Sequence, residues 1–196
     1  METDGSSTVA LTVANTAWRD AFDALEASGA LEAFDALQAL EALVDRIVRA
    51  ALDEAAATPW LRTGEVSLLL TDDAEIRTLN ATYRERDKAT NVLSFPGLDL
   101  VDGKASKPPL PGPVTLGDVA ISFERMAEEA KAERKGQTDH FAHLLVHGTL
   151  HLLGYDHTDD GRARVMEDLE AVILKSLGFS APYAAFADAD HPGMAT

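Results

Sequence analysis

Residues 140–157 read HFAHLLVHGTLHLLGYDH. The apolar residues between the histidines predict a buried helix, and Gly154 is the position at which that helix should end. His147 and His151 are four residues apart and therefore share one face of the helix. A turn at Gly154 can bring His157 back towards this pair, so that three imidazoles meet at one point.

Three imidazoles in this arrangement are a typical metal site. The chain has no cysteine, so only His, Asp or Glu can bind a metal. A three-histidine site leaves one coordination position open for water, which is typical of catalytic zinc rather than structural zinc. Zinc increases the acidity of that water and polarises a carbonyl or phosphoryl oxygen. The spacing predicts one Zn2+ ion per chain, bound by His147, His151 and His157, and a hydrolytic reaction.

The other histidines have a simpler interpretation. A single histidine on an apolar helix is usually packed and hydrogen-bonded, so His140 and His143 are left out of the metal site. His191 lies in the C-terminal tail and is interpreted as solvated. Asp156 could orient its neighbour His157 or serve the turn. Imidazoles also accept nickel and copper, so the identity of the metal stays open.

The histidine spacing also occurs in metzincin proteases, which makes peptide hydrolysis an alternative. Those enzymes carry a glutamate as general base directly after the first histidine, where this chain has Gly148. Phosphodiester cleavage depends more on the metal and on nearby positive charge, so an arginine near the site becomes a candidate. Arg84, Arg86 and Lys88 provide such charge.

Charge is unevenly distributed along the chain. The 196 residues carry a net charge of −16, which by itself argues against nucleic-acid binding. Residues 1–57 hold 11 acidic and 3 basic residues, a balance of −8, whereas residues 58–153 hold 14 and 11, a balance of −3. The middle segment can therefore carry a local positive patch, and RNA stays possible as a substrate.

Apolar strands and amphipathic helices alternate along the chain. Strands are expected at residues 8–13, 65–70, 92–95 and 116–122, and helices at 18–57, 72–83, 123–135, 138–153 and 160–177. This alternation predicts an α+β fold with a small mixed sheet and several helices, and the metal site lies on its C-terminal helical side.

Helix ends are predicted from capping residues. One of residues 71–73 is expected to cap the helix that follows, and one of residues 159–160 the last helix. Gly136 is expected to close the helix that begins at 123, and Thr138 or Asp139 to cap the histidine-bearing helix.

The Ala-rich segment before residue 57 is interpreted as a low-complexity helix. The element AFDAL occurs at residues 21–25 and 33–37, too few copies for a repeat architecture. Gly29 is expected to interrupt the helix. The positions expected to face the core recur at helical spacing: Leu37, Leu40, Val44, Ile47 and Val48.

The remaining segments define the extent of the domain. Residues 97–113 are rich in Gly, Pro, Asp and Lys and are interpreted as a mobile loop. Residues 1–183 are expected to form one domain, and residues 184–196 a disordered tail. The chain has no run of about 18 apolar residues and no secretory signal, so a cytoplasmic location without membrane contact is expected.

Four blocks of the sequence resemble the YbeY family of bacterial endoribonucleases. They are LNATYR at 79–84, DKATNVLSFP at 87–96, LGDVAIS at 116–122 and HGTLHLLGYDH at 147–157. The blocks stand in the family's order, and the resemblance that they mark extends over most of the chain from about residue 58 to Tyr183. Residues 19–40 fall outside the resemblance and are interpreted as an extra helical insertion.

The resemblance implies a zinc-dependent endoribonuclease that cleaves single-stranded RNA during 3′-end maturation of small-subunit (16S) ribosomal RNA and in ribosome quality control. It implies His147, His151 and His157 as zinc ligands and Arg84 as the residue that engages the scissile phosphate. The expected partners are RNA and the small ribosomal subunit or its assembly proteins. A ribosome-assembly or adaptor protein with a mainly structural metal site is the alternative.

Overall fold

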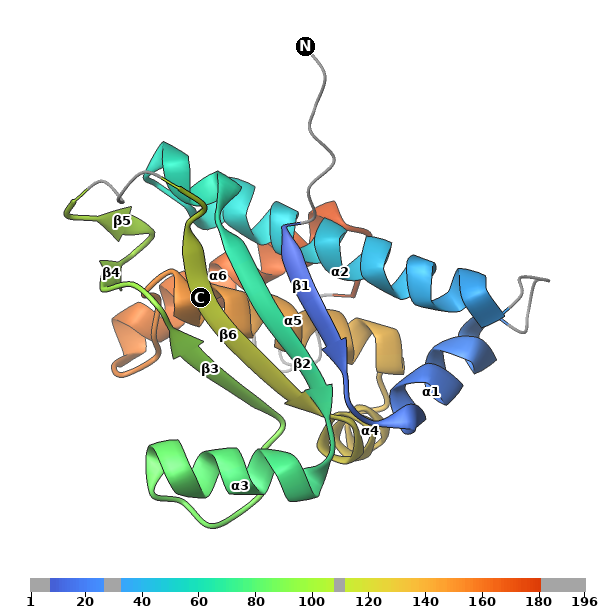
Figure 1. Cartoon of the computed structure of the whole chain (residues 1–196). Coiled ribbons are helices and arrows are strands. Elements are labelled where there is room, and N and C mark those ends of the chain that lie inside the picture. Colours follow the sequence, from blue (N-terminus) through green and yellow to red (C-terminus); the bar gives the residue numbers. More distant parts are fainter. Residues whose placement is uncertain (1–7, 27–32, 108–111, 181–196) are drawn as a thin grey trace, which may run out of the picture.

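A four-stranded sheet forms the frame of the computed structural model, which describes residues 8–26, 33–107 and 112–180. Its strands are β1 (Val9–Val13), β2 (Glu65–Thr71), β3 (Val92–Pro96) and β6 (Thr115–Ser122). The order is β1-β2-β6-β3, in which β1, β2 and β6 run parallel and β3 is antiparallel to β6 (Figure 1). Leu70 of β2 lies between Val13 and Ile121. The predicted α+β fold with a small mixed sheet is confirmed.

The helices alternate with these strands along the chain. They are α1 (Thr16–Glu26), α2 (Ala33–Ala55), α3 (Asp73–Arg84), α4 (Phe123–Ala132), α5 (Gln137–Leu152) and α6 (Asp160–Ser176), with a 3-10 turn at Pro59–Thr63. Figure 1 shows α2, α5 and α6 behind the sheet. α5 contacts α2, α4, α6, β3 and β6, so it is surrounded by other elements. This central position explains why its sequence is apolar around most of its circumference.

Trp18 fastens α1 to the sheet and to the helices behind it. Its side chain is fully buried, and the indole Nε1 donates a hydrogen bond to the carbonyl oxygen of Thr71 at 2.9 Å. The ring packs edge-on against Phe123 and Phe141, with centroids 5.3 and 5.4 Å away. One aromatic side chain therefore joins the end of β2 to α4 and α5.

The core face of α2 follows the predicted periodicity, with one exception. The buried positions are Leu40, Val44, Ile47 and Val48. Leu37 is 38% exposed, so its predicted place in the core is wrong. Figure 1 shows that the first turns of α2 extend past β1, the edge strand, where the sheet no longer covers the helix.

The helix caps were partly predicted. Asp72 caps α3 by accepting a hydrogen bond from the N–H of Glu75 at 2.9 Å. Asp159 caps α6 by accepting from the N–H groups of Gly161 and Arg162 at 2.9 and 3.0 Å. Both caps lie among the residues expected for them.

The junction between α4 and α5 differs from the prediction. Gly136 has a φ of −63° and is the N-cap of α5, so it does not close α4. The left-handed residue after α4 is Arg134, with a φ of 56°, because α4 already ends at Ala132. α5 begins at residue 137, which places Thr138 and Asp139 inside its first turn, so neither caps it.

Residues 97–113 contain a short hairpin, so their interpretation as a loop without structure is wrong for this part. The hairpin strands are β4 (Leu100–Val101) and β5 (Lys104–Ala105). Between them, the N–H of Gly103 donates to the Leu153 carbonyl at 2.9 Å, and its own carbonyl accepts from the N–H of Thr58 at 3.1 Å. A Cβ at Gly103 would lie 2.0 Å from the carbonyl oxygen of Ala55. The hairpin can pack against the ends of α2 and α5 because this residue has no side chain.

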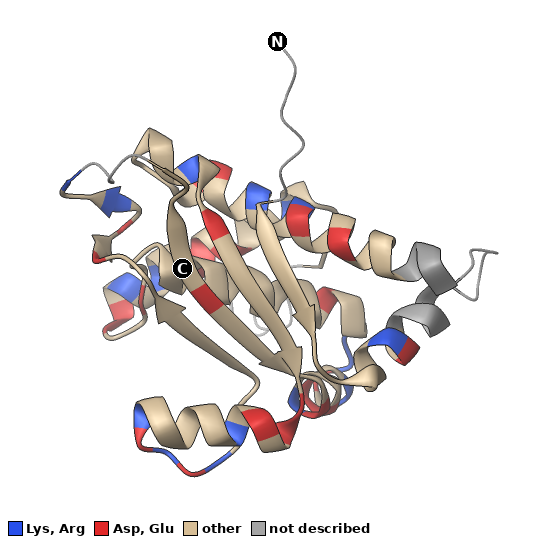
Figure 2. Ribbon diagram, viewed as in Figure 1, with Lys and Arg blue, Asp and Glu red and all other residues tan. Residues whose placement is uncertain are grey.

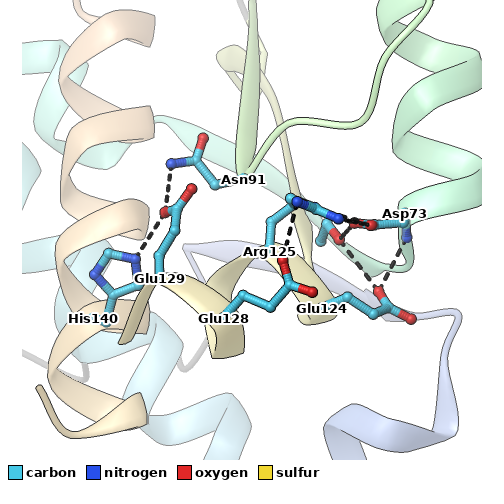
Figure 3. Close-up of polar contacts among 8 residues, drawn as sticks. Asp73, Asn91, Glu124, Arg125, Glu128, Glu129 and His140 are labelled. Atoms are coloured by element: carbon cyan, nitrogen blue, oxygen red, sulfur yellow. Dashed lines mark hydrogen bonds and ion pairs between the residues drawn. The ribbon is translucent and has the colours of Figure 1, made fainter. Parts of the chain in front are cut away.

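A polar network ties α3, α4 and α5 together near the ends of β2 and β6 (Figure 3). Arg125 of α4 donates to Asp73 of α3, with Nη2 and Oδ2 2.8 Å apart, and this hydrogen bond lowers the pKa of Asp73. Nearby, Glu129 of α4 lies 3.0 Å from Nε2 of the buried His140 on α5 and accepts from Asn91 at 2.9 Å. His140 is therefore packed and hydrogen-bonded, as predicted.

Some predictions lie outside the described residues. Gly29, residues 108–111 and the tail that holds His191 belong to this group, so the boundary at residue 183 stays a prediction. Within the ranges that are described, no helix has the length and apolar character required to cross a membrane.

Leu37 and Leu40 of α2 offer a direct test of the core boundary. Leu40→Ala should lower the free energy of unfolding by about 2–5 kcal/mol, because this side chain is 2% exposed and its removal leaves a cavity. Leu37→Ala removes the same atoms from the partly exposed position and should cost less than about 1 kcal/mol. Urea denaturation measures both. Equal losses would show that Leu37 also packs into the core.

Candidate metal centre

His147 and His151 lie one turn apart on α5, on the strip of the helix that faces a cleft. Their ring centroids are 4.6 Å apart, and their Nε2 atoms are 3.0 Å apart. The ring of His157 lies 5.6 Å from that of His147 and 5.1 Å from that of His151. Candidate ligand atoms of all three lie within 4.8 Å of one another. The structure thus brings the three predicted ligands together.

Hydrogen bonds assign the tautomers of the two helical histidines. Nδ1 of His151 lies 3.0 Å from the carbonyl oxygen of Tyr155, which can only accept, so Nδ1 carries the proton. Nδ1 of His147 lies 2.7 Å from Oε1 of Glu170 and donates in the same way. In a neutral ring with its proton on Nδ1, Nε2 has a lone pair that can bind a metal.

The two Nε2 lone pairs fit a bound cation. Burial, and after it the His147 imidazole, lowers the pKa of His151 to about 4, so this ring is neutral near pH 7. Two unprotonated nitrogens 3.0 Å apart repel each other unless a cation lies between them. Tetrahedral zinc with Zn–N bonds of about 2.0–2.1 Å holds two ligand nitrogens about 3.3 Å apart. The donor set and its spacing therefore suit a zinc-like ion.

Glu170 is a residue of this centre that the sequence interpretation missed. Its side chain is 1% exposed and contacts His147 through Oε1 and His143 through Oε2, the latter at 3.0 Å. Burial alone would raise the pKa of Glu170, but the hydrogen bonds from both imidazoles outweigh it and lower the pKa to about 2. The signal was available, because Glu170 stands in the apolar stripe of α6 with Met166 and Leu174, where an unpaired charge would be costly.

His143 and Glu170 also belong to a second group of candidate ligand atoms. Together with His147 they place one such atom each within 4.8 Å of the others. The carboxylate contacts of 2.7 and 3.0 Å are ordinary hydrogen-bond distances. His143 is therefore hydrogen-bonded, and its omission from the predicted site stays a prediction.

A left-handed turn after α5 sets the position of His157. Gly154 has a φ of +82°, and a Cβ there would lie 2.1 Å from the carbonyl oxygen of Leu100 in the hairpin. The hydroxyl of Tyr155 donates to the carbonyl of Ala55 at 2.9 Å, which fastens the turn to the end of α2. The third histidine is thus positioned by contacts with distant parts of the chain.

Asp156 serves this turn. Its Oδ1 accepts hydrogen bonds from the N–H and the hydroxyl of Thr158, at 3.1 and 2.7 Å. The same oxygen lies 2.7 Å from Nε of Arg162, the first basic residue of α6. Of the two roles considered for Asp156, these contacts favour the turn.

Gly148 lies where α5 packs closely against the sheet. A Cβ at this position would lie 2.8 Å from Cγ1 of Val119 on β6 and 3.2 Å from Oγ of Ser94 on β3. The Ser94 hydroxyl donates to the Gly148 carbonyl at 3.1 Å. No glutamate fits here, so the general base of the metzincin proteases has no place on this helix.

A cleft of about 950 Å³ opens in front of the histidines. The basic side chains that line it are Arg84, Arg86, Lys88 and Arg162. Asp156 is the one acidic residue along the described lining. Figure 2 shows charged residues along the end of α3 and the loop that follows it. The cleft is locally positive although the chain carries a net charge of −16.

Arg84 reaches this cleft from the last turn of α3. Its Nη2 donates to the carbonyl of Ser94 at 2.7 Å, and its guanidinium carbon lies 5.9 Å from the centre of the Phe95 ring. Asp87, three residues further along the chain, forms a two-point ion pair with Arg77 at 2.7 and 2.9 Å and not with Arg84. Arg84 and the three histidines therefore share one cleft.

Comparisons with known proteins give consistent matches. The family model described as endoribonuclease YbeY matches residues 30–178, so part of the predicted insertion at 19–40 falls within the match. A protein named endoribonuclease YbeY from Rhizobium johnstonii is 53% identical over 119 residues, 61% of this chain and just under two thirds (66%) of that protein. Relatives of the same name from Nitrobacter winogradskyi and Ruegeria pomeroyi are 49% and 47% identical, over 71% and 72% of this chain and 73% and 88% of their own lengths.

The role of Gly154 can be tested against Gly178, which has a similar φ of +84° but no atom within 4 Å of the place that a Cβ would occupy. Gly178→Ala should cost about 1–2 kcal/mol, the strain of a left-handed alanine. Gly154→Ala should cost a further 1–3 kcal/mol or so, because the Leu100 backbone must move, and it should also weaken metal binding. Denaturation and metal titration measure the two effects. Equal behaviour of the two variants would exclude the close contact with the hairpin.

Proposed function

The chain belongs to the YbeY family of endoribonucleases, and we propose that it cleaves single-stranded RNA in the cleft between Arg84 and its three-histidine centre. One observation carries the proposal. Three imidazoles converge in a cleft lined by four basic side chains, in a chain whose net charge is −16. A positive cleft on an otherwise acidic chain suits a polyanionic substrate.

Zinc is the metal that we propose for this centre, with one ion per chain bound by His147, His151 and His157. The neutral imidazole of His151 and the separation of 3.0 Å between the Nε2 atoms of His147 and His151 support this choice. When bound, the ion would supply Lewis acidity towards a phosphoryl oxygen and increase the acidity of water.

Arg84 is proposed to bind the scissile phosphate. Its hydrogen bond to the Ser94 carbonyl uses one N–H of the guanidinium and fixes the direction of the side chain. The guanidinium has five N–H donors in a fork that matches phosphate oxygens, so others remain for the substrate. Arg86, Lys88 and Arg162 line the same cleft and would contact neighbouring phosphates of a single strand.

The biological context that we propose follows the family. The substrate would be a precursor of small-subunit ribosomal RNA, cleaved at its 3′ end in the cytoplasm, with the small subunit or its assembly proteins as partners. The alternative is an assembly or adaptor protein in which the metal mainly stabilises the fold. The two differ in what loss of the metal does to folding and to cleavage.

Removal of two ligands tests the metal dependence. The His147→Ala/His151→Ala variant should lose the metal that the unaltered protein binds at one ion per chain, and should lose cleavage of a labelled single-stranded RNA. Metal content is measured by mass spectrometry and folding by circular dichroism. Cleavage that persists without metal would contradict the proposal. A metal-free variant that unfolds would favour the structural role instead.

Arg84 has a matched control on the same helix. Arg84→Ala should lower the rate of RNA cleavage by about 10²–10³-fold while the metal stays bound, since a charged donor to the phosphoryl group is lost. Arg77→Ala should leave the rate nearly unchanged, because Arg77 is paired with Asp87 and does not line the cleft. Single-turnover cleavage at saturating RNA measures both. Similar rates for the two variants would remove Arg84 from the proposed site.

A further inference from the structure

Glu170 is a buried carboxylate that the proposed reaction does not use. Among the residues that the structure describes, it is the one carboxylate in the core, with 1% of its surface exposed. It lies between Met166 and Leu174 in the buried stripe of α6. A charge in such a position is tolerated when it is fully paired, and a buried ion pair is weak evidence for added stability.

Both oxygens of Glu170 are used, each by a different imidazole of α5. Oε1 lies 2.7 Å from Nδ1 of His147, and Oε2 lies 3.0 Å from Nε2 of His143. A carboxylate can only accept, so each of these ring nitrogens carries a proton. In the neutral form of the His147 ring, a proton on Nδ1 leaves Nε2 without one, and Nε2 is the atom that faces His151 across 3.0 Å.

We propose that Glu170 is a positioning residue of the metal centre, which selects the tautomer of His147 and holds its ring so that Nε2 can bind the metal. His143 takes no part as a ligand; it holds the other oxygen of Glu170 and so fixes the carboxylate. The inference rests on the proposed function in so far as the centre binds a metal. A carboxylate that orients a metal-binding histidine through its second nitrogen raises metal affinity in other proteins by about 10–100-fold.

The chain contains a matched control for this contact. Glu129 of α4 makes the same kind of bond to a histidine of α5, with its Oε2 3.0 Å from Nε2 of His140 (Figure 3). His140 precedes His147 by about two helical turns and is not in the three-histidine group. Loss of the Glu129 carboxylate therefore perturbs α5 without touching a proposed ligand.

Glu170→Gln keeps the size of the side chain but offers one acceptor oxygen in place of two. The amide nitrogen cannot accept from an imidazole, so one of the two histidines must change its tautomer or lose its bond. We expect zinc affinity, measured by competition with a chelator, to fall about 10–100-fold in Glu170→Gln. In Glu129→Gln it should change by less than about twofold, since no ligand is involved.

Nitrogen-15 NMR of the histidine rings in the metal-free protein gives a second readout that needs no variant. We expect His147 to carry its proton on Nδ1 in the unaltered protein. A proton on Nε2 of His147 in the unaltered protein would overturn the inference even if Glu170→Gln did not fold.

Three other outcomes are decisive. Unchanged zinc affinity in a folded Glu170→Gln variant would overturn the inference and leave the proposed function intact. A second zinc equivalent that disappears in this variant, while the first is unaffected, would make Glu170 a ligand and overturn the positioning role. An unaltered protein that binds no zinc would overturn the proposed metal centre as well, so the two failures are distinguishable.

Discussion

The close packing of α5 against β6 at Gly148 is the constraint on which the rest of the site depends. Gly148 has no side chain, so α5 can lie so near to β6 that a Cβ at this position would be 2.8 Å from Val119. A helix surrounded by α2, α4, α6 and the sheet has only a narrow strip left for polar side chains. His147 and His151 occupy that strip, so the packing that buries the rest of α5 also fixes the direction in which these two side chains point.

Local features of the site could be predicted from the sequence, and long-range ones could not. The helical period fixes the relation of His147 to His151, and a glycine after the apolar run predicts a turn at Gly154. The structure has this glycine in the left-handed region. The part played by Glu170 depends on how α6 lies against α5, which no spacing within either helix reveals. The exposure of Leu37 likewise depends on where the sheet ends, a tertiary property that overrides the periodicity of α2.

The electrostatics of the cleft are short-range. A net charge of −16 repels a polyanion as it approaches, yet surface charges are screened beyond about 8 Å at physiological ionic strength. At the cleft itself four basic side chains face one carboxylate. The acidic exterior disfavours unspecific contact with a polyanion, whereas the cleft attracts it. A nucleic-acid chain is therefore favoured in the cleft over the rest of the surface.

The hydrogen bond from Tyr155 to the carbonyl of Ala55 joins residues 100 positions apart, so its formation closes a long loop during folding. His147 and His151 are neighbours as soon as one turn of helix forms. The position of His157 is set by contacts with the end of α2 and with the hairpin, and closing such long loops has an entropic cost that precedes any gain from the contacts. The pair of histidines on α5 is therefore a local feature of the chain, whereas the group of three belongs to the completed fold.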